Sequence, residues 1–447
     1  MSDLHLTVDR SRGRLGAQVA AELRRAVRDG RLTGGTRLPS SRALAHDLGV
    51  ARGVIVSAYE QLVAEGFLLS RTGDGTRVAG SCAPADVAEP QERAGAECRA
   101  AETAGPYDLR PGVPDLSAFP RAAWLSALRH ALAAMPHSEF AYPDPAGVAE
   151  LREELAGYLG RVRAAVAAPG QIVITGGVAH GLSTVVRLLG GPLALEDPTS
   201  ERQIPLLRAT GVPLLPIPVD AEGMDVAALA RSGARTALLT PAHQFPTGVV
   251  LSPARRAALL AWARETGGHV LEDDYDAEFR YDREPVGCLQ GVAPDRVVLL
   301  GSVSKALAPA LRLGWLVAPP ALAAAAARHR VDTDLGSPAV DQHALAHLLA
   351  SGRYDRHLRH MRRLYRSRRD ALVEALAAHL PQARVEGVSA GLHLYVHLEG
   401  AEEGFFERAS ALGVTLQPTT PGALLLGYAS QPPHRLAEAV RLLARAL

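Results

Sequence analysis

Lysine is almost absent from the sequence: of its 48 lysine and arginine residues, only Lys305 is a lysine. The two residue types serve about equally well on a solvated surface, so this bias removes lysine wherever only charge is needed. A Schiff base, however, requires a neutral primary amine, which a guanidinium group cannot supply. Lys305 is therefore either a surface lysine retained by chance or a residue with a chemical role.

Cysteine and long apolar runs are also scarce. The three cysteines, Cys82, Cys98 and Cys288, show no metal-ligand spacing and cannot all pair, which is typical of a cytoplasmic protein without a metal site. No apolar run approaches a membrane span and the first residues are polar, so we expect neither a membrane segment nor a signal peptide. The net charge of +1 indicates no polyanionic partner for the whole chain, but the first 80 residues hold twelve arginines against eight acidic residues.

Residues 1–80 are expected to form a winged helix-turn-helix. Apolar residues at intervals of four predict a first helix across 15–27. A second short helix is expected after it, with Ser40 as its N-cap, and a third helix spans about 51–65. The Gly-rich segment 71–75, between two short apolar strands, predicts the wing.

The rest of the chain divides into a linker and a large α/β domain. Residues 81–106 are rich in Ala, Glu, Gly and Pro without apolar periodicity, which predicts a flexible linker. Residues 107–447 alternate short apolar strands with amphipathic helices, the pattern of a mostly parallel sheet followed by a small α+β lobe. The strands of the large sheet are expected at 171–175, 193–196, 237–240, 269–272, 297–301 and 314–317, with helices at 178–189 and 253–266 and a long basic helix at 354–379.

Basic and hydroxyl side chains of the N-terminal domain are the candidates for binding double-stranded DNA. The first turn of the third helix in such a fold meets base edges in the major groove, and Arg52 lies there. Further candidates for base or phosphate contacts are Ser40, Ser41, Arg42, Arg71 and Arg77. Four arginines on one side would also fit the solvated face of a protein–protein module. The eight arginines between residues 353 and 369 pose the same choice, and there a solvated face is the commoner outcome.

The surroundings of Lys305 predict a pyridoxal 5′-phosphate site. Such a site needs an amine for the aldimine, cations and hydroxyls for the phosphate, and an acid that keeps the pyridine nitrogen protonated. Lys305 follows an apolar strand, and its phosphate-binding neighbours would be Ser302, Ser304 and Arg312. The N-terminus of the helix at 178–189 would add backbone N–H groups, contributed by Gly176, Gly177 and Val178.

The acid is expected at the end of a neighbouring strand, in the sequence EDDYD at 272–276. On an extended chain Asp273 and Tyr275 share a face, so one can reach the ring nitrogen while the other bonds the 3′-oxygen. If the chain turns at this point, Asp274 instead of Asp273 would face the ring nitrogen, and the sequence does not decide between the two. Taken alone, the segment would also fit an acidic solvated loop.

The N-terminal motifs resemble those of the GntR family of winged-helix regulators. The match covers about 70 residues, with Arg42 and Arg52 where the family places its DNA-contacting arginines. Gly53 stands where the family often has a hydroxyl residue, so this chain has no side chain for one of the expected base or phosphate contacts. The segments that carry the resemblance are RLPSSR (37–42), LGVAR (48–52), AYEQL (58–62), EG (65–66) and GDGT (73–76).

The C-terminal motifs resemble the fold-type I aminotransferases and, through EDDYDAEFRY at 272–281, the MocR/GabR subfamily, which fuses a GntR-type winged helix to an aminotransferase-like domain. The segment around Tyr142 resembles the one whose tyrosine reaches the partner subunit's phosphate. The loop TPAHQFPTG at 240–248, with His243 and Gln244, resembles the loop beside the cofactor 3′-oxygen. The resemblance implies pyridoxal 5′-phosphate and a homodimer in which each DNA-binding head packs against the partner's large domain.

Two departures from the family pattern bear on activity. The segment DPTS at 197–200 lacks a usual aromatic residue, and Arg202 follows where an arginine can bind an effector carboxylate. No arginine occurs at 423–428, where aminotransferases bind the substrate carboxylate, so full transamination is not expected, whereas weak or half transamination stays open.

The favoured hypothesis is a transcription regulator that senses an amine, an amino acid or pyridoxal phosphate itself through Lys305. The alternative is an active aminotransferase with an accessory DNA-binding module.

Overall fold

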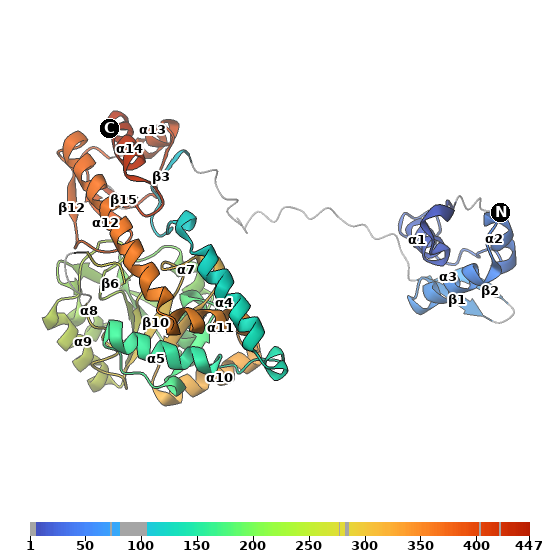
Figure 1. The fold of residues 1–447 in the computed structure, drawn as a ribbon, viewed down its shortest axis with the longest axis horizontal. Coiled ribbons are helices and arrows are strands. Elements are labelled where there is room, and N and C mark those ends of the chain that lie inside the picture. The colour runs from blue at the N-terminus through green and yellow to red at the C-terminus, as the bar shows by residue number, and fades with distance from the viewer. Residues whose placement is uncertain are drawn as a thin grey trace. The chain divides into compact units, whose positions relative to one another are not determined.

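The computed structural model describes residues 6–71, 74–80, 105–276, 278–281, 286–401, 404–419 and 422–447. They form two compact units, one within Met1–Ala100 and one within Ala101–Leu447 (Figure 1). Apart from its last two residues, the expected linker at 81–106 lies outside the described residues, so its boundaries stay predictions. None of the helices in the described ranges combines the length and apolarity that a membrane crossing requires.

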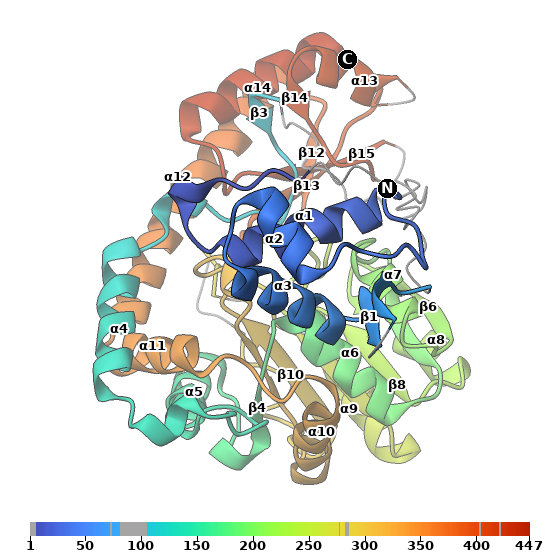
Figure 2. The ribbon, with the colours of Figure 1, turned by 90° about the vertical axis from the view of Figure 1, so that its right-hand side faces the viewer.

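The N-terminal unit is three helices followed by a two-stranded wing (Figure 2). Its core is formed by the apolar face of the first helix together with buried residues of the third, among them Val19, Leu23 and Ile55. An ion pair of 2.8 Å between Arg24 and Glu65 ties these two helices at their ends. The elements are η1 (Arg10–Arg12), α1 (Leu15–Arg28), α2 (Ser41–Leu48), α3 (Arg52–Ala64), β1 (Leu68–Arg71) and β2 (Gly75–Val78).

The C-terminal unit is built on an eight-stranded sheet of order β4-β11-β10-β9-β8-β5-β6-β7. The five central strands, from β10 to β6, are parallel, whereas β11 is antiparallel to both of its neighbours. The strands are β4 (Ile172–Thr175), β5 (Leu193–Asp197), β6 (Leu214–Asp220), β7 (Gly223–Met224), β8 (Thr236–Leu239), β9 (His269–Asp273), β10 (Val297–Ser302) and β11 (Gly314–Val317).

Helices cover both faces of this sheet because the side chains of the central strands are apolar on both faces. In β9, Leu271 packs into the cluster with α6 and α10, while its neighbour Val270 packs into the cluster with α8 and α9. The helices are η2 (Leu116–Ala118), α4 (Arg121–Ala134), η3 (His137–Phe140), α5 (Ala149–Arg163), η4 (Pro169–Gln171), α6 (Val178–Leu189), α7 (Gln203–Arg208), α8 (Val226–Arg231), α9 (Pro253–Thr266), η5 (Pro309–Leu311), α10 (Pro320–Thr333) and α11 (Ala339–Ala350).

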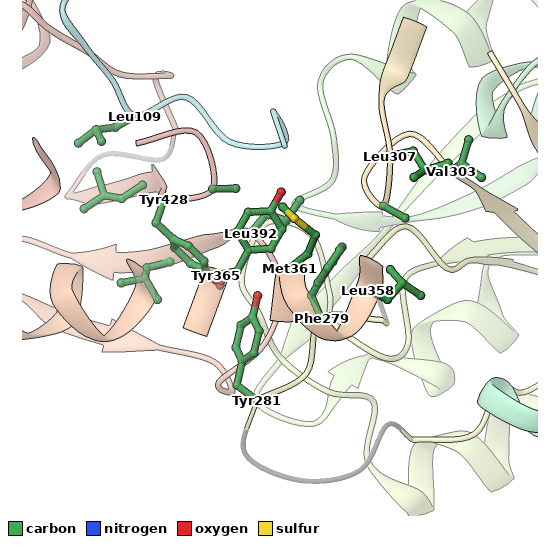
Figure 3. Packing of buried hydrophobic residues seen from close by; sticks show 14 of the residues in the cluster. Leu109, Phe279, Tyr281, Val303, Leu307, Leu358, Met361, Tyr365, Leu392 and Tyr428 are labelled. Atoms are coloured by element: carbon green, nitrogen blue, oxygen red, sulfur yellow. The ribbon is translucent and has the colours of Figure 1, made fainter. Parts of the chain in front are cut away.

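The long helix α12 (Arg353–His379) runs from α11 to a smaller lobe (Figure 1). Its buried face packs on aromatic residues from both parts, with the rings of Phe279 and Tyr365 5.1 Å apart at their centroids (Figure 3). The lobe has a sheet of order β12-β13-β15, the pair β3–β14 and two helices. Its elements are β3 (Tyr107–Asp108), β12 (Arg384–Glu386), β13 (His393–His397), α13 (Phe405–Ala411), β14 (Val414–Thr415), β15 (Ala423–Gly427) and α14 (Pro433–Ala446).

Candidate cofactor site and DNA-binding surface

A cavity of about 240 Å³ opens at the carboxyl ends of β9 and β10. This is the edge at which open parallel sheets bind ligands, because the loops that leave the strands converge there. Of the residues expected from the sequence, those that line the cavity are Val178, Arg202, Asp273, Tyr275, Ser302, Ser304, Lys305 and Arg312. Thr199, Ser200, Thr240 and Phe245 also line the cavity, and they belong to the segments DPTS and TPAHQFPTG of the family pattern. Lining residues that the sequence did not indicate are Gly112, Ala179, Gln203, Leu392 and His393.

The amine of Lys305 lies inside this cavity. It follows β10, and Nζ donates a hydrogen bond to the carbonyl oxygen of Gly112, a residue of the loop that follows β3. Burial lowers the pKa of Lys305, and the positive charge of Arg202 lowers it further. Both effects favour the neutral amine, which is the form that reacts with a carbonyl group.

Asp273 is the acid of the cavity. Its Oδ2 accepts a hydrogen bond of 2.7 Å from Nε2 of Gln203, while Oδ1 is buried and has no hydrogen-bond partner among the residues that the structure describes. Burial raises the pKa of Asp273 to about 6, against the lowering effect of the Gln203 bond. A buried carboxylate oxygen without a donor is a suitable partner for a protonated ring nitrogen.

Asp274 points elsewhere. Both of its carboxylate oxygens accept hydrogen bonds of 2.7 Å from the guanidinium group of Arg163, and both side chains are buried. Of the two aspartates that the sequence left open, Asp273 therefore faces the cavity.

The phosphate end of the expected site is formed by Ser302, Ser304, Arg312 and the start of α6. A Cβ atom on Gly177 would lie 3.1 Å from the Arg312 guanidinium group, so the glycine allows the arginine to approach the backbone. Val178 lines the cavity at the N-terminus of α6. The helix end and the guanidinium group together attract an anion.

Gly176 does not contribute the N–H donor that the sequence suggested. Its backbone N–H donates a hydrogen bond of 3.1 Å to Nδ1 of His180, one turn into α6. Its carbonyl oxygen accepts a hydrogen bond from Arg312. Gly176 thus shapes the turn and orients Arg312, because its donor is already used.

His243 and Gln244 lie behind the cavity wall and are absent from its lining. Nδ1 of His243 is 2.9 Å from both the hydroxyl of Tyr275 and Oδ2 of Asp276. Gln244 donates to the carbonyl oxygens of Pro198 and Phe245, within its own loop and the one after β5. These two residues support the wall that Tyr275 and Phe245 form.

Two further candidates lie at the surface. Tyr142 is 83% exposed and does not line the cavity, and its role toward a partner subunit stays a prediction. Arg202 is exposed at the cavity, where it forms no ion pair or side-chain hydrogen bond with a described residue.

The residues in the cavity fit pyridoxal 5′-phosphate. They offer an amine of lowered pKa, a buried carboxylate oxygen without a donor, and a cationic helix terminus for the phosphate. When bound, this cofactor supplies an electron-withdrawing ring next to the amine. Lys305 would hold the cofactor, Asp273 would face its ring nitrogen, and Ser302, Ser304 and Arg312 would bind its phosphate.

The winged-helix unit brings most of its candidate DNA-binding residues to the starts of α2 and α3 and to the wing. Nε of Arg52 donates to Oγ of Ser41 over 3.3 Å, which links the first turns of the two helices. Oγ of Ser40 accepts from the backbone N–H of Ala43 and caps α2, as expected. Arg42, Arg52 and Arg71 are exposed.

Arg77 differs from the other three arginines. Its guanidinium group pairs with Asp74 at 3.1 Å and also donates to the carbonyl oxygen of Gly35. Part of its charge is therefore neutralised within the wing.

Comparison with known families identifies both parts of the chain. Residues 110–442 match the model "Aminotransferase class I and II", and residues 15–78 match "Bacterial regulatory proteins, gntR family". Together these matches confirm the winged helix-turn-helix and the fold-type I aminotransferase-like domain expected from the sequence.

Known regulators align with most of the chain. The pyridoxine biosynthesis transcriptional regulator PdxR of Corynebacterium glutamicum is 38% identical over 84% of this chain and 82% of its own length. The probable rhizopine catabolism regulatory protein MocR of Rhizobium meliloti is 31% identical over 96% of this chain and 93% of its own. Among solved structures, the α-aminoadipate aminotransferase LysN of Thermus thermophilus, bound to a phosphopyridoxyl-leucine, matches with a TM-score of 0.68, 28% identity, and coverage of 76% of this chain and 91% of its own.

Proposed function

Because this chain belongs to the MocR subfamily of GntR-family transcription regulators, we propose that pyridoxal 5′-phosphate, bound at Lys305, is the signal that changes its affinity for DNA. The chain acts in the cytoplasm as a homodimer, with a DNA-binding head at 1–80 and a linker at 81–106. Its aminotransferase-like domain, at 107–447, serves as the effector-binding domain.

The single observation that carries this proposal is the lining of the cavity. It holds every group that the cofactor needs, namely the amine of Lys305, the free oxygen of Asp273 and the cationic phosphate end at Arg312. The relative PdxR, a regulator of pyridoxine biosynthesis, supports the cofactor itself as the signal.

A second candidate signal is an amine or amino acid that joins the cofactor. Arg202 favours it, since this exposed cation lies at the same cavity as Lys305 and forms no ion pair with an acid among the described residues. β15, where the resemblance places the substrate-binding arginine of the enzymes, is instead a run of buried apolar residues. Rapid aminotransferase turnover therefore has less support than ligand sensing.

The test is a titration of promoter DNA from the chain's own gene with cofactor-free protein, with protein plus pyridoxal phosphate, and with protein plus the cofactor and a panel of amines. We expect the cofactor alone to change the affinity, and Lys305→Ala to abolish both this change and the visible absorbance of the bound cofactor. Lys305→Arg is the matched variant, because it keeps a long polar side chain in the cavity but cannot form the covalent bond.

Each outcome of this titration supports a different function. A response that needs an amine as well as the cofactor would transfer the role of signal to the amine. Equal DNA affinity in all conditions would refute sensing. A ligand that binds two conformations of the protein equally well does not shift the equilibrium between them. Multiple turnovers with an amino acid would favour the enzyme.

A further inference from the structure

We propose that the exposed face of α12 is a second DNA-binding surface, which contacts the phosphate backbone outside the sequence read by the winged helix. The surface consists of Arg356, Arg359, Arg363 and Arg366, with His360 between them, and is called here the α12 stripe. These residues recur every three or four positions, so they lie on one side of the helix.

The buried face of α12 fixes where this stripe points. Residues such as Leu358, Met361 and Tyr365 pack into the core, as Figure 3 shows. At 100° per residue, the average direction of the stripe is roughly opposite to that of these three residues. All five residues of the stripe are accordingly exposed.

The eight arginines of α12 separate into two groups. Four have partners within the protein: Arg353 bonds Ser126, Arg362 bonds the carbonyl oxygen of Glu278, Arg368 pairs with Asp115 at 2.6 Å, and Arg369 pairs with Asp370. The first three fix the helix to the rest of the domain, whereas Arg369 and Asp370 are neighbours on α12 itself.

The four arginines of the stripe have no such role. None of them forms an ion pair or a side-chain hydrogen bond with any residue that the structure describes. Asp355, the acid nearest in sequence, is engaged by Arg161 of α5 at 2.9 Å. A solvated helix face normally mixes acids with bases at i, i+4 spacing, whereas this face carries only basic residues from Arg356 to Arg366, and its acids, Asp370 and Glu374, follow one and two turns later.

The dimensions and charge of the stripe suit duplex DNA. From Arg356 to Arg366 the helix rises about 15 Å, close to half a helical turn of B-DNA. The net charge of the chain is only +1, so the stripe is a local concentration of charge. Arginine side chains bind phosphate through paired N–H donors, and such contacts need no particular base sequence.

The experiment compares two variants of the full-length, cofactor-loaded protein. The stripe variant carries Arg356→Gln, Arg359→Gln, Arg363→Gln and Arg366→Gln. The control variant removes the same charge from exposed arginines elsewhere on the domain, through Arg231→Gln, Arg235→Gln, Arg264→Gln and Arg328→Gln. Visible cofactor absorbance and thermal unfolding verify that both variants fold.

Binding is measured by fluorescence anisotropy over a range of salt concentrations, on the promoter fragment of the chain's own gene. One form of the fragment is trimmed to the footprint of the isolated heads, and the other is extended by about two helical turns on each side. On the extended DNA we expect the stripe variant to bind at least tenfold more weakly than the control variant. For the stripe variant, the slope of log affinity against log salt concentration should be shallower by about 0.9 for each phosphate that the variant no longer binds. On the trimmed DNA the two variants should bind alike.

Equal binding of the two variants to the extended DNA would overturn the proposal. An equal loss of DNA affinity in both variants would also overturn it, because the loss would then result from the net charge of the protein and not from the stripe. Neither outcome depends on whether pyridoxal phosphate is the signal, since the cofactor is present throughout.

Discussion

Gln203 hydrogen-bonds the carboxylate of Asp273 and favours its charged form: Nε2 of the amide donates to Oδ2 over 2.7 Å. The two residues are 70 positions apart, at the start of α7 and the end of β9. Burial raises the pKa of Asp273 to about 6, and the bond from Gln203 opposes that rise. The amide thereby helps to keep a negative charge in the cavity near neutral pH.

Gln203→Leu is expected to shift the pH dependence of cofactor binding. Without the amide donor the pKa of Asp273 rises further, so a larger fraction of the carboxyl is neutral at neutral pH. Since the charged form pairs with a protonated ring nitrogen, affinity for pyridoxal phosphate should fall several-fold at neutral pH and recover in alkaline solution. In the unaltered protein the corresponding loss should begin only near pH 6 and below. The measurement is an absorbance titration with the cofactor at a series of pH values.

Asp273→Asn provides the control for this shift. It removes the titrating group, so adding Gln203→Leu to it should leave the pH profile unchanged. Identical profiles for the unaltered protein and the Gln203→Leu variant would exclude Gln203 from this role.

Asp273→Asn and Asp274→Asn should have opposite effects on the stability of the cofactor-free protein. In the folded chain the pKa of Asp273 is about 6, against a reference value of 3.8. Between these values the folded state holds more protons than the unfolded state, so the contribution of this group to stability falls as pH rises through the window. Removing the carboxylate should raise the free energy of unfolding at neutral pH, and the gain should disappear in acid.

Asp274→Asn breaks a buried ion pair and leaves Arg163 charged without its partner. Such a loss costs about 3–5 kcal/mol. Denaturant unfolding of the two variants and the unaltered protein measures both effects. Below its unfolding temperature, Asp274→Asn should retain the cofactor absorbance, and a loss of that band in the folded variant would contradict the assignment of Asp273 to the cavity.

Local sequence patterns predicted the parts of the fold whose neighbours in the chain decide their structure. The strand before Lys305 and the helices at 178–189 and 253–266 occur where expected, because their apolar periodicity is regular. β6 was missed because Pro216 and Pro218 interrupt its pattern. Apart from its last two residues it pairs only with β5, and such an edge strand tolerates proline.

The site residues that were missed depend on contacts between distant parts of the chain. Gln203 is polar, lies on a six-residue helix and belongs to no motif, so nothing local indicates its bond to Asp273. The choice between Asp273 and Asp274 was likewise decided by Arg163, 111 positions away. Gly176 was misjudged because His180, within the first turn of α6, takes the N–H that was assigned to the phosphate.

His180 should tune phosphate binding without affecting the amine. Its Nδ1 accepts from Gly176, and Nε2 lies 3.4 Å from Asp334. His180→Leu removes the acceptor and leaves the N–H of Gly176 unpaired, which costs about 1–3 kcal/mol. His180→Asn is the matched variant, because its side-chain oxygen can occupy nearly the same position. Gly176 shapes the turn that orients Arg312 toward the phosphate. Affinity for pyridoxal phosphate should therefore fall several-fold in His180→Leu and recover in His180→Asn.

Binding of pyridoxal, which lacks the phosphate, separates this effect from general damage to the fold. We expect His180→Leu to leave pyridoxal affinity unchanged. An equal loss for both compounds would indicate a structural role alone.

Arg52 and Arg77 should differ in their importance for DNA binding. Arg52 is exposed at the first turn of α3, where a base contact would contribute about 1–3 kcal/mol. Arg77 is paired with Asp74, so its removal also frees an acid and deprives the wing of an internal ion pair. Arg52→Ala should therefore reduce the ratio of promoter affinity to random-sequence affinity, whereas Arg77→Gln should weaken both affinities by a similar factor. Competition binding with the two DNAs measures this ratio, and an unchanged ratio in Arg52→Ala would mean that Arg52 contacts only the backbone.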